Sequence, residues 1–187
     1  MSTFALLAVT GLGLGALYFM VASGLSLILG LMRVLNLAHG AFLTVAAYAA
    51  WSVIQMIPDQ TGWLAMVVAI VVGIVAGGLF ATLTEMILIR PLYRREIGQV
   101  LVTVGLWLAT VSLIHGIFGA DQKIIALPTA LTETTAILGA AIPNARLIII
   151  AFAVVLYLLL YFFLKRTRYG LITVSYTHLT LPTILRV

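Results

Sequence analysis

The chain has 187 residues, of which 64% are hydrophobic and only 8% are charged, and its mean hydropathy is +1.24. Average soluble domains carry roughly a quarter charged residues, so this composition excludes an ordinary soluble fold. The net charge of +5 does not indicate nucleic-acid binding, because the basic residues form short clusters between apolar runs, as membrane anchoring requires.

Five apolar segments are predicted to be long enough to cross a bilayer, which needs about 20 residues each. They cover approximately 4–31, 40–57, 63–89, 97–119 and 146–164. The first contains several glycines, and its pattern is compatible with one helix or with two shorter ones. Arg90-Pro91 is predicted to end the third, and a polar connection over 120–145 precedes the fifth. The sequence therefore predicts an all-α, polytopic transmembrane helical bundle of about five spans.

The distribution of Lys and Arg predicts the orientation. The connections after the first, third and fifth segments hold seven basic residues, and the other two connections hold two, Lys123 and Arg146. Basic residues accumulate on the cytoplasmic side, so we expect the first group there and the N-terminus outside. No basic stretch precedes the first apolar run, so we expect that run to stay as a membrane helix rather than a cleaved signal peptide.

A small polar island separates the first two apolar segments. It contains Arg33, Asn36 and His39, and Gly40 follows it. Polar side chains at such a place are costly unless they lie at the membrane surface, in the protein interior or beside water. One interpretation is an interfacial loop in which Asn36 caps the next helix. The other is a motif buried against protein, in which Gly40 permits a close backbone approach and His39 forms hydrogen bonds without transferring protons.

The other polar positions indicate structure rather than chemistry. Glu85 is the one acid inside a predicted span, and its neighbour Arg90 favours an ion pair or a snorkelling side chain. Two pairs of glycines spaced four apart, Gly11 with Gly15 and Gly73 with Gly77, each share one helix face, which favours close helix packing over a dimer interface. No phosphate loop, metal-ligand spacing or nucleophile elbow occurs, and there is no cysteine. The sequence therefore predicts no catalytic residue, cofactor or metal site.

Several blocks of the sequence resemble the permeases of branched-chain amino-acid ABC importers. These blocks are 24–30, 35–42 with Ala47-Tyr48, the run from Glu85 through Arg90-Pro91 to Arg94, 101–106, and 167–170. The resemblance covers about residues 1–170. It makes six residues candidates for a structural or translocation role: Asn36, His39, Gly40, Glu85, Arg90 and Pro91.

The resemblance implies a permease subunit, in the bacterial inner membrane, for branched-chain amino acids. It also implies a second permease subunit, two cytoplasmic ATPases and an extracytoplasmic solute-binding protein as partners, with no enzymatic activity in the permease itself. Three alternatives remain open: a permease for urea or short amides, a membrane scaffold that does not transport, and a secondary carrier driven by ions. The lack of an embedded charge network argues against the carrier.

The sequence changes character after Gly170. The family continues there with a cytoplasmic docking helix and further spans, whereas residues 171–187 are rich in threonine and contain Pro182. We therefore expect 1–170 to be the N-terminal part of a longer permease domain and 171–187 to be a non-native tail. We also expect the 187-residue chain to insert into the membrane without coupling to an ATPase.

Overall fold

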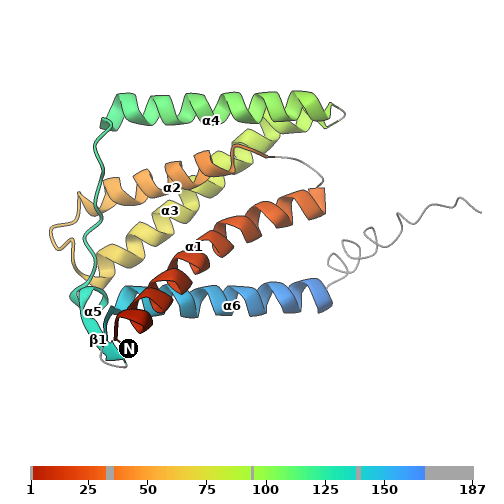
Figure 1. Ribbon diagram of the computed structural model, residues 1–187. Coiled ribbons are helices and arrows are strands. Elements are labelled where there is room, and N and C mark those ends of the chain that lie inside the picture. Colours follow the sequence, from red (N-terminus) through yellow and green to blue (C-terminus); the bar gives the residue numbers. More distant parts are fainter. Residues whose placement is uncertain (1, 33–35, 94, 138–139, 167–187) are drawn as a thin grey trace, which may run out of the picture. The chain divides into compact units, whose positions relative to one another are not determined.

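The computed structural model describes residues 2–32, 36–93, 95–137 and 140–166 (Figure 1). It divides into two compact units. Unit 1 contains α1 (Ser2–Met32), β1 (Thr134–Ile137), β2 (Ala140–Pro143) and α6 (Asn144–Arg166). Unit 2 contains α2 (His39–Ile54), α3 (Trp63–Thr84), the π-helix η1 (Glu85–Ile89), the 3₁₀ turn η2 (Arg90–Leu92), α4 (Glu96–Phe118) and α5 (Thr129–Thr132). The tail expected at 171–187 lies outside the described residues.

Unit 1 is a parallel pair of long apolar helices with a short hairpin between them in sequence. Arg146 near the start of α6 donates a hydrogen bond to Thr10 Oγ1, and the rings of Phe19 and Tyr157 meet edge to face at 6.2 Å. From the first contact to the second the residue number increases in both helices, so the two helices run parallel. The glycines of α1 do not divide it, because it is one helix of 31 residues. The prediction of a possible break is thus resolved in favour of a single helix.

The hairpin of unit 1 is a feature that the sequence analysis did not predict. β1 and β2 pair antiparallel, with Thr134 opposite Pro143 and Ile137 opposite Ala140. The Thr135 hydroxyl also hydrogen-bonds Asn144 Oδ1 at 2.5 Å, which ties β1 to the first residue of α6. Part of the connection expected over 120–145 is therefore ordered by strand pairing rather than left as a loop.

Unit 2 is organised by the contact between α2 and α3, which run antiparallel side by side (Figure 1). Small residues spaced four apart form the buried stripe of α3: Ala65, Ala69, Gly73 and Gly77. Ideal Cβ atoms built on Gly73 and Gly77 would lie 3.1 Å from the Ala46 carbonyl oxygen and 3.0 Å from Ala46 Cβ. The absence of side chains therefore lets the two backbones approach closely. This confirms the packing prediction for Gly73 and Gly77. Cβ atoms on Gly11 and Gly15 of α1 would meet nothing within 4 Å, so the close packing predicted for that pair is not seen among the described residues.

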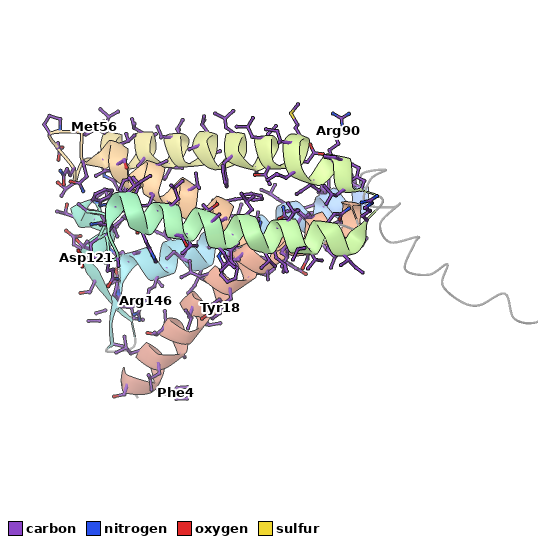
Figure 2. The ribbon with its side chains drawn as sticks, turned by 90° about the horizontal axis from the view of Figure 1, so that it is seen from above. Phe4, Tyr18, Met56, Arg90, Asp121 and Arg146 are labelled. Carbon is purple, nitrogen blue, oxygen red and sulfur yellow. The ribbon has the colours of Figure 1, made fainter. Side chains whose placement is uncertain are left out.

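The third helix of unit 2, α4, lies against α2 in a parallel sense. Its Trp107 lies beside Gly40 near the start of α2, and its Phe118 contacts Trp51 near the end of α2. Figure 2 shows the two ends of the unit, with Met56 and Asp121 at one end and Arg90 at the other. The predicted topology requires basic and acidic turns at opposite ends of the unit. Which of the two ends faces the cytoplasm stays a prediction.

Within the described residues, four helical segments are long and apolar enough to cross a bilayer: Thr3–Gly30, Trp63–Leu92, Ile97–Phe118 and Asn144–Arg166. α2 is the exception, because its 16 residues extend only about 24 Å, less than the hydrocarbon thickness of about 30 Å. Most large apolar side chains of the four long helices are exposed, as expected for surfaces that contact lipid. The predicted all-α, multi-pass membrane fold is confirmed, with one of the five apolar helices shorter than a full span.

Pro91 alters the helix type at the end of the third span. It does not end the span at Arg90-Pro91, contrary to the prediction from the sequence. The α-helix ends at Thr84, and the chain continues as the π-helix η1 and then the 3₁₀ turn η2. Proline has no N–H to donate and its ring collides with the carbonyl four residues earlier, so an ordinary α-helical ladder cannot continue through it. The backbone widens to π geometry before the proline and tightens to a 3₁₀ turn that contains it, and the helical path reaches Leu92.

Candidate functional site

The chain enters α2 through a buried turn that Asn36 stabilises. Asn36 Oδ1 accepts a hydrogen bond from the Ala38 backbone N–H at 3.0 Å, and the Asn36 carbonyl accepts one from the His39 N–H at 3.3 Å. Asparagine is suited to such turns because its short side chain imitates a backbone carbonyl. The N-cap of α2 is Ala38, which makes no side-chain capping bond. Asn36 therefore stabilises the turn that precedes the helix and does not itself cap it.

This turn lies well inside the length of α3. The Phe42 ring contacts Phe80 at 5.8 Å, and twelve residues separate Phe80 from Leu92, about 18 Å of helix. His39 precedes Phe42 by less than one turn. The start of α2 therefore lies on the order of 10 Å from the level of Leu92, measured along the axis of α3. Non-helical backbone at such depth is tolerated only where protein buries it or water reaches it. Asn36 and Ala38 meet the first condition, with exposures of 5% and 0%.

His39 and Gly40 begin α2 but do not behave as expected. The Nδ1 atom of His39 is buried and has no hydrogen-bond partner among the described residues, so the hydrogen-bonding role is not seen at this nitrogen. Gly40 is exposed, and a Cβ there would meet only Trp107 Nε1 at 3.8 Å, an ordinary contact. The expectation of a tight backbone approach at Gly40 is wrong for the contacts inside unit 2. It occurs instead at Gly73 and Gly77.

A polar face of α4 adds three buried side chains that the sequence analysis did not single out. Gln99, Thr103 and Thr110 are spaced four and seven apart, which places them on one side of the helix. Gln99 Nε2 donates to the Leu92 carbonyl at 2.8 Å, and Thr103 Oγ1 donates to the Val100 carbonyl at 3.1 Å. The spacing was visible in the sequence, but threonine is compatible with many environments and gave no separate signal.

The buried polar side chains are concentrated in one part of the molecule. Among the described residues they are Asn36, Thr84, Gln99, Thr103 and Thr110, and all of them belong to unit 2. None carries a charge, so none imposes the large desolvation cost of a buried ion. The interior of unit 2 thus offers neutral hydrogen-bonding groups at the start of α2, the end of α3 and along α4.

Glu85 lies at the start of η1 and binds a tyrosine rather than an arginine. The Tyr93 hydroxyl donates a hydrogen bond to Glu85 Oε1 at 2.5 Å. This bond, with the negative charge of Glu85, raises the pKa of the Tyr93 phenol, and the charge of Arg90 opposes the increase. Among the described residues no ion pair joins Glu85 to Arg90, so the expected pairing is corrected to a carboxylate–phenol contact across η2.

The turn between η2 and α4 is held by contacts to Leu92. The Arg95 N–H donates to the Leu92 carbonyl at 2.8 Å, in addition to the bond from Gln99. Arg90, Pro91 and Arg95 are exposed and line an open hollow of about 800 Å³ with Tyr93 and Gly98. The six predicted residues thus form two separate groups in unit 2: Asn36, His39 and Gly40 at the start of α2, and Glu85, Arg90 and Pro91 at the basic end of the unit.

The chemistry that this arrangement offers is neutral hydrogen bonding. Among the described residues no group of three or more His, Asp or Glu side chains could hold a metal ion. The polar groups inside unit 2 are amides and hydroxyls, which form hydrogen bonds but are weak nucleophiles unless a base activates them.

Comparisons with known proteins agree with this interpretation. The family described as "Branched-chain amino acid transport system / permease component" matches residues 7–177. The high-affinity branched-chain amino acid transport system permease protein LivH of Escherichia coli K12 is 29% identical over 84 residues, and LivH of E. coli O157:H7 matches equally. This alignment covers 43% of the chain and 27% of the relative. No solved structure matches the chain significantly. The family match extends over most of the chain, which therefore belongs to the permease components of branched-chain amino acid transport systems and is a multi-pass protein of the inner membrane.

Proposed function

We propose that the chain is the N-terminal part of the permease subunit of an ATP-driven importer that carries branched-chain amino acids across the cytoplasmic membrane. The family match over residues 7–177 is the observation that carries this proposal. The relative from E. coli is named as part of a high-affinity branched-chain amino acid transport system, which supports the substrate class. The permease itself performs no covalent chemistry in this scheme.

The proposed function requires partners. A second permease subunit completes the pathway, two cytoplasmic ABC ATPases bind and hydrolyse ATP, and an extracytoplasmic solute-binding protein delivers the amino acid. ATP binding drives the change between outward-open and inward-open states, because the solute itself supplies no energy for transport against a gradient. The basic hollow around Arg90 and Arg95 faces the cytoplasm in this scheme, as the positive-inside rule predicts.

Four of the six predicted site residues have a defined part in the proposal. Asn36 fixes the turn at which α2 begins inside the protein, and His39 places a buried, unpartnered nitrogen beside it. Glu85 and Pro91 shape the wide end of the third span, where Tyr93 closes the turn. These residues position the polar interior of unit 2 and do not react with the solute.

Uptake of radiolabelled L-leucine tests the proposal. A full-length permease that contains residues 1–170 of this chain is expressed with a cognate ATPase and a solute-binding protein in cells that lack their own branched-chain amino-acid importers. We expect uptake that depends on ATP and that excess L-isoleucine or L-valine inhibits. A matched strain with an ATPase variant that cannot hydrolyse ATP should show no uptake.

The same assay separates the alternatives. Uptake of labelled urea or acetamide without leucine uptake would replace the substrate class and keep the importer. Leucine uptake abolished by a protonophore but not by the ATPase variant would indicate a secondary carrier. A chain that co-purifies with partners but supports no uptake of any of these solutes would be a scaffold, which contradicts the proposal.

A further inference from the structure

An aromatic cluster closes the end of unit 2 that carries Asp121. Phe118, the last residue of α4, lies 4.9 Å from Tyr48 and 5.9 Å from Trp51, measured between ring centroids. Tyr48 and Trp51 are three residues apart on α2 and so share one face of it. The cluster therefore joins the ends of two parallel helices at one rim of the unit.

Gly119 redirects the chain over this cluster. Its backbone has φ +82° and ψ 170°, a combination open essentially only to glycine. The α4 helix ends there, and the following segment passes the end of α2 on its way to α5 (Figure 1). This path places the Lys123 ammonium group 5.5 Å from the centroid of the Trp51 ring.

A pocket of about 110 Å³ lies at this contact. Its lining consists of Ala47, Tyr48, Trp51, Lys123 and Ile125, so four of the five residues present apolar or aromatic surface and one carries a charge. Lys123 is half-buried, and no carboxylate of the described residues lies within ion-pair distance of its ammonium group. The Trp51 ring face attracts this cation but does not neutralise it.

We infer that this pocket is a binding site for an aliphatic α-amino acid, with the ligand carboxylate on the Lys123 ammonium group and its side chain against Tyr48, Trp51 and Ile125. The inference rests on the proposed function and deepens it, because it names residues that receive the solute. The pocket volume corresponds to about four water-sized groups, which matches the four carbon atoms of an isobutyl side chain. A charge-assisted contact to carboxylate fixes orientation, and the apolar walls favour branched aliphatic side chains.

Equilibrium binding to the 187-residue chain in nanodiscs tests the inference with the unmodified protein. The probes are radiolabelled L-leucine and, as competitors, unlabelled L-leucine, L-leucinamide and glycine. L-Leucinamide keeps the ammonium group and side chain but lacks the carboxylate, so we expect it to compete about tenfold more weakly than L-leucine. Equal or stronger competition by L-leucinamide would mean that the aromatic rings take the ligand ammonium, which overturns the assignment. Absence of L-leucine binding up to millimolar concentration would overturn it as well.

Variants locate the binding in the pocket. We expect Lys123→Gln to weaken L-leucine binding about tenfold, and Lys123→Arg to restore most of the loss because a cation is retained. Lys165→Gln is the matched control, since Lys165 also lies over an aromatic ring, 5.1 Å from the centroid of Tyr161. An equal loss in Lys123→Gln and Lys165→Gln would show that the effect is not local and would overturn the inference.

The uptake assay distinguishes failure of this inference from failure of the proposed function. If the full-length permease transports leucine with the same KM with and without Lys123→Gln, the pocket assignment is wrong while the importer stands. If the full-length permease without this substitution transports no branched-chain amino acid, the proposed function itself fails. A KM increase of about tenfold for Lys123→Gln, with binding lost in parallel, supports both.

Discussion

The packing of α2 on α3 can be tested with two adjacent glycines that differ in their surroundings. An ideal Cβ on Gly77 lies 3.0 Å from Ala46 Cβ and 3.4 Å from the Phe42 carbonyl oxygen, whereas a Cβ on Gly78 has no neighbour within 4 Å. Both residues belong to α3, so a substitution affects helix propensity equally at the two positions. Gly77→Val and Gly78→Val therefore differ chiefly in the interhelical contact.

The expected difference follows from what surrounds the new side chain. At Gly77 the obstacles are a Cβ and a backbone oxygen of α2, which move only if the whole helix shifts. Overpacking of this kind costs about 1–3 kcal/mol in the free energy of unfolding. At Gly78 we expect no loss, because valine has space and is a slightly better helix former than glycine. For a chain of this size the cost corresponds to a decrease of roughly 2–12 °C in Tm.

Thermal unfolding in detergent, followed by circular dichroism at the helix minimum, measures this difference. Gly77→Ala adds a graded test, because its single methyl group should give a smaller decrease than valine. Equal Tm values for Gly77→Val and Gly78→Val would refute the close packing of α2 on α3. A decrease that is larger for Gly78→Val would place the tight contact on the wrong face of the helix.

Three further predictions concern orientation, ionisation and backbone conformation. An impermeant thiol reagent applied to intact cells should label Gln60→Cys and not Arg95→Cys; the chain has no cysteine to give background, and the reverse labelling would contradict the predicted orientation. Tyr93 should ionise above the usual pKa of about 10, so its contribution to stability is present below pH 10 and is lost as pH rises through the raised pKa. Subtracting the tyrosinate absorbance titration of Tyr93→Phe from that of the parent isolates this group, and Glu85→Gln should lower its pKa. Gly119→Ala should lower stability by about 1–3 kcal/mol, because alanine rarely adopts a positive φ, and an unchanged Tm would contradict this.

Hydrophobicity located the helices of this chain well but not every end. The fourth apolar segment was expected over 97–119 and forms α4 at Glu96–Phe118, because a long apolar run in a membrane protein must satisfy its backbone as helix. The second run continues to Ile57, yet α2 ends at Ile54. Apolar character alone does not mark where backbone hydrogen bonding stops, so the shorter length of α2 could not be predicted.

Tertiary contacts explain what the sequence analysis missed at the candidate site. Glycine has several uses, and the sequence did not distinguish the packing glycine Gly77 from the exposed Gly40. The partner of Glu85 was expected to be the nearby Arg90, but the turn through Pro91 brings Tyr93 to it instead. Lys123 and Trp51 are far apart in sequence, and only the path after Gly119 brings them together. Local patterns thus identified the elements, while contacts between elements decided the roles of single residues.

The two units differ in where they bury polar side chains. The long helices of unit 1 have almost entirely exposed apolar surfaces, and the described part of this unit buries no polar side chain. Unit 2 lines its interior with amides and hydroxyls that are already bonded locally, as at Thr103 and Gln99. Neutral groups of this kind can exchange hydrogen bonds with a passing zwitterion without holding it as tightly as fixed charges would. Transport needs such moderate binding, because a solute that binds too strongly does not leave. A cation at the rim, Lys123, with neutral groups deeper inside the described part of unit 2, is compatible with the proposed translocation of an amino acid.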